Sequence, residues 1–354
     1  MMEVMLESAE TAGLKMNSKK SYCMIFGKMV KPDIINGLRV VSELKYLGIW
    51  VNDSEDCYKE HKKIKLNLAR KMSNITFSVV SRCCNRVIVG STYWKSVVLP
   101  TLLNGAAVVT YTVSELEQLQ RVENCVWRYI LGAPRCAPVV TLRGEIGASS
   151  MEARDMKTKL TYACHLLTTG NEMLKQVARV AFEEKFKFVE KTLSYAKCVD
   201  LQSVFQLAEC TKREIKERTK LWDTERWRKD KAERSSIEVY DRFKDNIRQE
   251  DFYHNDKVSR LVYRLRSNTA KLNWRNRFVG GSELCALCEE EEVETLEHFL
   301  VKCSAYNLIR EKHDARGAPL SDLLLFTSEV VNRESVLQFL GEAWSFREDY
   351  MSRL

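Results

Sequence analysis

The spacing of apolar residues along the chain predicts a short mixed opening followed by a long helical region. Residues 1–12 show a helical pattern, and the apolar run Tyr22–Phe26 predicts a buried strand. Two further strands are expected at Gly37–Val41 and Leu44–Val51, where β-branched and aromatic residues cluster. Strand signals largely vanish after residue 60, so the remainder should be almost entirely helical.

The first long helix should begin near Tyr58 and carry basic residues opposite an apolar stripe. The stripe consists of residues three or four positions apart: Ile64, Leu68, Met72, Ile75 and Val79. Further helices are predicted at 86–104, 114–131 and 150–168. Residues 212–248 mix both charge signs with spaced aromatic residues, which favours a long solvated helix that packs its aromatics on a neighbour.

These elements indicate an α+β fold that is predominantly α, and 354 residues are enough for two or three modules. We expect a small α/β unit at residues 1–55 and a helical domain at residues 56–150. A helical connector should follow at residues 151–250. Residues 251–354 should form a C-terminal unit with a basic segment and its own helices.

Positive charge is concentrated in two parts of the chain. Overall the chain carries a net charge of only +8, with 45% hydrophobic and 29% charged residues, as in ordinary folded proteins. Residues 15–95, however, hold sixteen Lys or Arg against six Asp or Glu, and residues 257–280 hold seven against none. Such concentrations suit a polyanionic partner, because each neutralised phosphate releases counterions. The alternative is a solvated basic surface.

The cysteine pattern favours a reducing, intracellular compartment, either nucleus or cytoplasm. The twelve cysteines are scattered, and no secretory leader pattern opens the chain. The longest apolar run, Val97–Tyr111, contains Pro100 and Asn104 and is shorter than the roughly 20 residues that span a bilayer. We therefore expect no membrane partner.

Four residues near the C-terminus have the spacing of a zinc site. Cys285, Cys288, His298 and Cys303 follow the order Cys-x2-Cys-x9-His-x4-Cys, which supplies three thiolates and one imidazole. Four protein ligands leave no position for water, so the expected Zn²⁺ would be structural. Five residues along an α-helix rotate a side chain by roughly 140°, so Cys303 should lie where the helix of His298 frays or turns. This places a small zinc knuckle within residues 251–354.

The knuckle itself is acidic, so we assign it to scaffolding and the basic segment before it to nucleic-acid contact. That segment interleaves cations with aromatic rings, which combines phosphate charge with stacking surfaces for unpaired bases. The predicted contacts are Arg260, Arg264, Arg266, Lys271, Trp274, Arg275 and Arg277. The alternative for Trp274 and Phe278 is a core position beside the metal.

Several stretches, taken in order, resemble one family. Ala12–Ser21, running into the first strand, resembles the palm segment that follows the catalytic aspartates in reverse transcriptases, and Ser42–Ile49 resembles the succeeding primer-grip hairpin. Leu99–Gly105 and Leu116–Gly132 are similar to the thumb, and the zinc knuckle fits the tail, of non-LTR (LINE-type) retrotransposon enzymes. The resemblance covers residues 1 to about 132 and about 255 to 345.

The resemblance implies a palm remnant at 1–55, a thumb at 56–150, and binding of RNA or an RNA–DNA duplex. Lys20 matches a basic residue near the departing pyrophosphate, and Tyr46, Leu47 and Gly48 match the primer grip. The helix along the template–primer duplex would carry Lys62, Lys63, Lys65, Arg70 and Lys71.

The carboxylates for nucleotide addition are missing from this sequence. RNA-directed DNA polymerases hold two Mg²⁺ ions with an aromatic-any-Asp-Asp turn and an earlier Asp, and here that turn would precede Met1. No two Asp residues are adjacent in the chain. We therefore expect a truncated element product, a gene-model fragment or a domesticated remnant that retains nucleic-acid binding, with Mg²⁺ needed only if the upstream part is supplied.

Two alternatives remain. The first is a protein-interaction module of packed helices stapled by zinc. The second is a metal-dependent nuclease, in which Asp33 and Glu43 on adjacent strands would hold Mg²⁺ and Lys45 would polarise water. The nuclease pattern is weak, because such short motifs recur by chance and the same residues fit the primer-grip hairpin.

The chain alone is expected not to extend a primed RNA template in the presence of Mg²⁺, because it lacks the metal-binding carboxylate pair. Incorporation of labelled nucleotides is the measurement, with boiled protein as the control. Template-dependent incorporation above that control contradicts the expectation.

Overall fold

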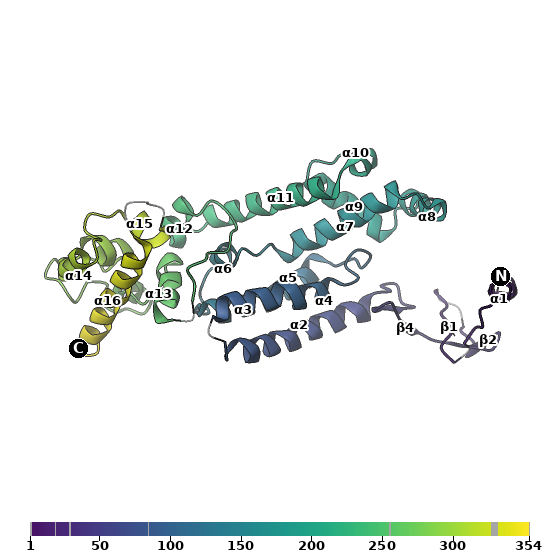
Figure 1. Ribbon diagram of the computed structural model, residues 1–354, viewed down its shortest axis with the longest axis horizontal. Helices are drawn as coiled ribbons and strands as arrows, with labels where there is room; N and C mark the ends of the chain where they lie inside the picture. Colours follow the sequence, from purple (N-terminus) through teal and green to yellow (C-terminus); the bar gives the residue numbers. More distant parts are fainter. Residues whose placement is uncertain are drawn as a thin grey trace.

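Helices dominate the molecule, as the α+β, mainly α prediction requires. The computed structural model describes residues 2–17, 19–27, 30–83, 85–254, 256–326 and 332–353. Ser18 of the palm-like stretch and residues 327–331 of the C-terminal unit lie outside these ranges. Figure 1 shows an elongated molecule with its termini at opposite ends of the long axis. Within the described ranges every strand lies before residue 53, apart from two isolated bridges.

The N-terminal unit contains one helix and two small sheets. Helix α1 (Met2–Thr11) is followed by β1 (Tyr22–Cys23), β2 (Ile34–Ile35) and β3 (Leu38–Val40), which form a sheet in the order β1-β3-β2. Strands β4 (Glu43–Tyr46) and β5 (Ile49–Asn52) form a separate antiparallel hairpin.

The strand predictions for this unit were partly wrong. The run Tyr22–Phe26 forms a strand only over its first two residues, and Phe26 is exposed. The stretch Leu44–Val51 folds on itself, because Leu47 and Gly48 both adopt positive φ and make the tight turn of a hairpin. Apolar composition alone cannot distinguish one strand from two short ones.

The central layer consists of α2 (Lys59–Val80), α3 (Arg86–Tyr93), a π-helical turn (Trp94–Val98), α4 (Leu99–Leu103) and α5 (Val113–Leu131). Helix α2 packs along α5, and α3 approaches α5 closely at a glycine. A Cβ on Gly90 would lie 2.7 Å from the side chain of Ile130, so a larger residue would separate the two helices.

The buried face of α2 differs from the predicted apolar stripe. Ile64, Ile75 and Val79 are exposed. The buried positions are small or polar: His61, Lys65, Ala69, Ser73, Thr76 and Val80. The polar members find partners at close range; Lys65, for example, donates from Nζ to the carbonyl of Thr101 at 2.6 Å. The stripe prediction was therefore right for Leu68 and Met72, which pack against the core, and wrong for the other three, because helical spacing identifies a face but not the neighbour that covers it.

A second layer covers the first. It contains α6 (Val139–Ile146), α7 (Met151–Thr168), α8 (Glu172–Glu183), α9 (Lys187–Cys198), α10 (Val204–Glu209) and α11 (Lys212–Ala232). Figure 1 shows α7 and α11 running side by side. The long charged helix predicted at 212–248 ends at Ala232, and a 3₁₀ turn (Ser235–Ile237) and α12 (Glu238–Phe243) follow. Trp227 is fully buried, as predicted for the aromatics of this segment.

The C-terminal unit packs on the central layer rather than standing apart. It contains α13 (Lys257–Arg266), α14 (Asn307–Lys312), α15 (Leu320–Leu325) and α16 (Arg333–Met351), with short 3₁₀ and π turns between them. One apolar core includes Trp127 of α5, Val262 of α13 and Phe339 of α16. The predicted segments 56–150 and 251–354 therefore share a core. Among the described helices, none combines the length and apolar character needed to cross a bilayer.

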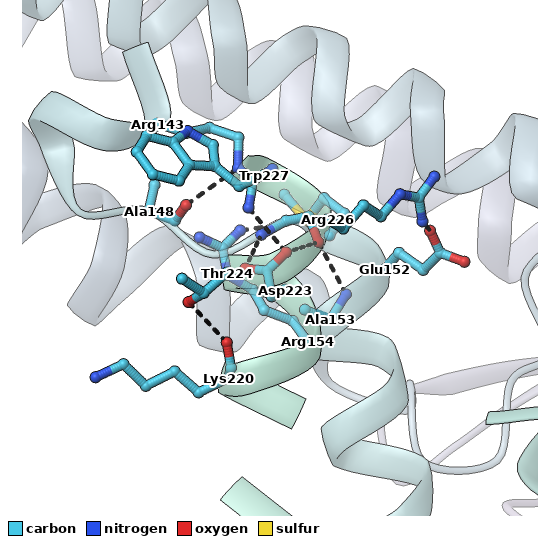
Figure 2. A network of polar contacts seen from close by, with 12 residues as sticks. Arg143, Ala148, Glu152, Ala153, Arg154, Lys220, Asp223, Thr224, Arg226 and Trp227 are labelled. Atoms are coloured by element: carbon cyan, nitrogen blue, oxygen red, sulfur yellow. Dashed lines mark hydrogen bonds and ion pairs between the residues drawn. The ribbon is translucent and has the colours of Figure 1, made fainter. Parts of the chain in front are cut away.

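A buried ion pair and neighbouring hydrogen bonds join the connector, residues 151–250, to this core. Asp223 of α11 accepts hydrogen bonds from Arg143 Nη2 at 2.8 Å and from Ser150 Oγ at 2.7 Å (Figure 2). Trp227, one turn further along α11, donates from its indole to the carbonyl of Val140 at 2.8 Å. These bonds join α6, the start of α7 and α11 at a single point.

Replacing Asp223 by alanine is expected to lower the free energy of unfolding by about 3–5 kcal/mol, because the buried Arg143 guanidinium loses its counter-charge. Asp245→Ala, at an exposed position outside any helix, should change it by no more than about 0.5 kcal/mol. Urea-induced unfolding measures both variants. Equal free energies of unfolding in the two variants would show that the contacts of Asp223 do not stabilise the packing of the layers.

Candidate metal centre and the adjoining basic turn

A small hairpin presents two of the predicted metal ligands. Leu284 pairs with Val293 in an antiparallel bridge, and the amide of Cys285 donates to the carbonyl of Glu292 at 2.8 Å. The loop between them carries Cys288. The Cys-x-x-Cys spacing thus turns both thiols toward the same side of the hairpin, where the other two ligands lie.

A π-helical turn presents the other two ligands. Residues His298–Lys302 form this turn, and the amide of Cys303 donates to the carbonyl of His298 at 2.8 Å. This i→i+5 bond closes a wider turn than the i→i+4 bond of an α-helix, so it brings Cys303 to the same side of the turn as His298. The sequence prediction that Cys303 lies at the end of the His298 turn is confirmed.

The four ligand atoms are placed for tetrahedral coordination. All lie within 4.8 Å of one another; the sulfurs of Cys285 and Cys303 are 3.9 Å apart, and Cys288 Sγ is 3.4 Å from His298 Nε2. A tetrahedral Zn²⁺ with bonds of about 2.3 Å to sulfur requires sulfurs about 3.8 Å apart. Cys288 is half-buried and the other three ligands are buried. The donor set and its geometry therefore fit a closed zinc site.

The electrostatics of the cluster also suit a cation. A hydrogen bond from Cys303 lowers the pKa of Cys285 to about 4, which favours a thiolate at neutral pH. The same bond, together with burial, raises the pKa of Cys303. His298 Nδ1 lies 3.0 Å from a carboxylate oxygen of Glu292, a contact that directs Nε2 toward the sulfurs.

A buried carboxylate joins the metal cluster to the basic segment. Glu294 is fully buried and accepts two hydrogen bonds from the guanidinium of Arg347, at 2.6 and 2.7 Å. It also accepts a bond from the amide of Asn273 at 2.6 Å. Asn273 begins a 3₁₀ turn, Asn273–Phe278, which we call the basic turn. Sequence reasoning missed this junction, because the partners of Glu294 are 21 and 53 positions away.

The basic turn stacks guanidinium groups on aromatic rings. The Arg277 guanidinium lies 4.8 Å from the ring centre of Trp274 and 4.9 Å from that of Phe278, and Arg275 lies 5.4 Å from Trp274. Phe278 is 66% exposed, so it is not a core residue, whereas Trp274 is half-buried and packs against the core. Of these two residues, only Trp274 partly occupies the core position that the alternative interpretation predicted.

A cleft of about 490 Å³ adjoins the basic turn. Its lining contains four turn residues, Trp274, Arg275, Arg277 and Phe278, together with hydroxyl and amide side chains. No carboxylate belongs to this lining. We call this feature the aromatic cleft.

The other predicted contacts of the basic segment are scattered. Arg266 is buried and pairs with Glu145 at 3.2 Å and Glu250 at 3.4 Å, so it stabilises the interior. Arg260 and Arg264 are half-buried on α13, and Lys271 is exposed. Only the predicted contacts on the basic turn are brought together around a cleft.

The basic residues of α2 also divide into two groups, those that are buried or ion-paired and those that are exposed without an ion-pair partner. Lys65 is buried on a carbonyl, and Lys62 pairs with Asp56 at 2.9 Å and Glu115 at 3.3 Å. Lys63 is exposed and pairs with Glu60 at 3.1 Å. Two residues, Arg70 and Lys71, are exposed and have no ion-pair partner among the described residues.

The palm-like contacts lie at the far end of the molecule. Lys20 is exposed in the loop before β1. Tyr46 and Leu47 are exposed at the tip of the β4–β5 hairpin, next to Gly48. A hairpin thus forms where the primer-grip resemblance expects one.

The nuclease arrangement is not formed. Asp33 precedes β2 in the three-stranded sheet, whereas Glu43 and Lys45 lie on β4 in the separate hairpin. The two carboxylates therefore do not stand on adjacent strands, as that chemistry requires.

No family model, curated protein or solved structure matches the chain. The functional interpretation therefore depends on the chain's own residues.

The protein purified under reducing conditions is expected to contain one zinc ion per chain, and Cys288→Ser should lose it because three ligands hold zinc more weakly than four. Cys198→Ser, at an exposed cysteine of α9, is the matched control and should retain the metal. Metal analysis by mass spectrometry measures all three proteins. Absence of zinc from the unmodified chain, or equal loss in both variants, would remove the site.

Proposed function

We propose that the chain binds RNA or an RNA–DNA duplex through the basic turn, as part of a protein of the non-LTR reverse transcriptase type. The observation that carries the proposal is the aromatic cleft, in which the Arg277 guanidinium lies over the rings of Trp274 and Phe278 and no carboxylate lines the wall. Aromatic rings and guanidinium planes stack on unpaired bases, while the arginine charge attracts phosphates.

The metal supports this surface without contacting the ligand. Zinc would hold Cys285, Cys288, His298 and Cys303, and Glu294 would transmit that order to the basic turn through Asn273. A turn held in one conformation loses little entropy on binding, so preorganisation raises affinity. The role of zinc is therefore structural.

The reverse transcriptase assignment is supported by the order of features along the chain. The exposed tip of the β4–β5 hairpin precedes α2, whose Arg70 and Lys71 are exposed, and the zinc cluster follows near the C-terminus. Nucleotide addition is proposed only for a complex in which an upstream part supplies the Mg²⁺-binding aspartates.

A second candidate function, a zinc-stapled protein-interaction module, is favoured by one observation. Helix α8 exposes an apolar stripe formed by Met173, Val177 and Val180, of which 74%, 62% and 52% are exposed. Such a stripe is typical of helices that pack against a partner protein. Salt dependence separates the two functions, because a phosphate contact weakens steeply as salt rises and an apolar contact does not.

The double variant Trp274→Ala, Arg277→Ala is expected to bind single-stranded RNA about ten-fold more weakly, because one base–aromatic stack is worth roughly 1–3 kcal/mol and one phosphate contact is lost. The matched control is Phe205→Ala, Arg316→Ala, which removes an exposed aromatic ring and an exposed arginine elsewhere. Fluorescence anisotropy at several salt concentrations measures the dissociation constants. Equal weakening in both variants, or binding that is independent of salt, contradicts the proposal.

A further inference from the structure

A groove between the two helical layers is lined by cations and by no carboxylate. It lies among the π-helical turn with α4, the start of α7 and the first half of α11, with a volume of about 350 Å³. We call it the lysine groove and define it by its basic lining residues: Lys95, Arg154, Lys157, Lys216 and Lys220. Only Lys95 lies within the concentrations of positive charge found in the sequence, because the surroundings of the other four mix both charge signs.

Four of the five cations have no carboxylate partner among the described residues. Arg154 is the exception, since its Nη1 lies 2.8 and 3.0 Å from the two oxygens of the fully buried Glu123. Lys157, Lys216 and Lys220 are exposed. Figure 2 shows Lys220 extending away from the Asp223 cluster, with its ammonium group joined to no other drawn residue.

Lys95 is the most enclosed of the unpaired cations. Its ammonium donates to the carbonyl of Ile146 at 2.7 Å and to the side-chain oxygen of Gln249 at 3.0 Å, which are neutral acceptors. Burial, and then the charge of Arg154, lowers the pKa of Lys95. A bound anion would offset both effects by supplying the missing negative charge.

Several other cations of α11 have a carboxylate partner. Arg213 pairs with Glu217 at 2.9 Å, Lys231 pairs with Asp241 at 3.1 Å, and Arg226 pairs with Glu152. The helix therefore has acids within reach of many of its cations, but none lines the groove.

We propose that the lysine groove binds the phosphate backbone of the same nucleic acid that the aromatic cleft engages, an inference that rests on the proposed function. Lysine ammonium groups bind phosphate as point charges, and the groove offers no aromatic ring on which a base could stack. The groove thus contributes affinity without sequence preference. The same phosphate chemistry is present in small polyphosphates, which the experiment distinguishes from a nucleic-acid backbone.

The test compares two triple variants that remove the same charge. The groove variant is Lys157→Gln, Lys216→Gln, Lys220→Gln, at exposed positions whose replacement leaves the core intact. The control variant is Lys187→Gln, Lys197→Gln, Lys229→Gln, at exposed lysines outside the groove. Each binds a labelled single-stranded RNA of twenty nucleotides over a range of salt concentrations.

The groove variant is expected to reduce the slope of log K against log salt by about 2, because each phosphate contact contributes roughly 0.7 for single strands. The control variant should leave the slope close to that of the unmodified chain. Tripolyphosphate, tested by calorimetry, should bind weakly and compete with the RNA.

Four outcomes overturn the proposal. Equal slope changes in both triple variants mean that only total charge matters. An unchanged slope in the groove variant, together with weaker binding by Trp274→Ala, Arg277→Ala, rejects the groove but leaves the proposed function standing. Tight tripolyphosphate binding that the groove variant loses while its RNA binding is unchanged assigns the groove to a small anion. A chain that binds no RNA at all removes the proposed function as well.

Discussion

The buried carboxylate of Glu294 is the constraint on which the candidate site depends. An ionised carboxylate is costly in the interior unless it is paired and hydrogen-bonded, and Glu294 meets this condition only when Arg347 and the amide of Asn273 reach it together. These partners belong to the last helix and to the basic turn. The metal hairpin, the C-terminal helix and the basic turn must therefore adopt their positions as one unit.

The same physical rule governs the rest of the molecule. Arg143 with Asp223, Arg266 with Glu145, and Arg154 with Glu123 are buried pairs that join elements far apart in the sequence. Lys159 forms a further buried pair within α7, with its ammonium 2.5 Å from Asp155, and its bonds to the carbonyls of Ala106 and Val109 connect α7 to the segment before α5. Each pair neutralises the charge of one cation. The charge available to a partner is consequently smaller and more localised than the composition indicates.

Two hollows are lined by cations and by no carboxylate, and they differ in chemistry. The aromatic cleft combines arginine with Trp274 and Phe278, which suits unpaired bases. The lysine groove has ammonium groups and no aromatic ring, which suits phosphates. A nucleic acid presents both groups at regular intervals, so the two surfaces together describe one class of ligand better than either does alone.

The sequence by itself determined the helix-rich class, most of the long helices and all four residues of the metal cluster, because helical periodicity and ligand spacing are local properties. Tertiary structure decided which cations are free. Arg266 and Arg277 look alike in the sequence, yet one is buried on Glu145 and the other stacks on Trp274. Arg266 pairs with a residue more than a hundred positions away, and the stacking of Arg277 depends on how the turn encloses it. No local pattern in the sequence encodes either contact.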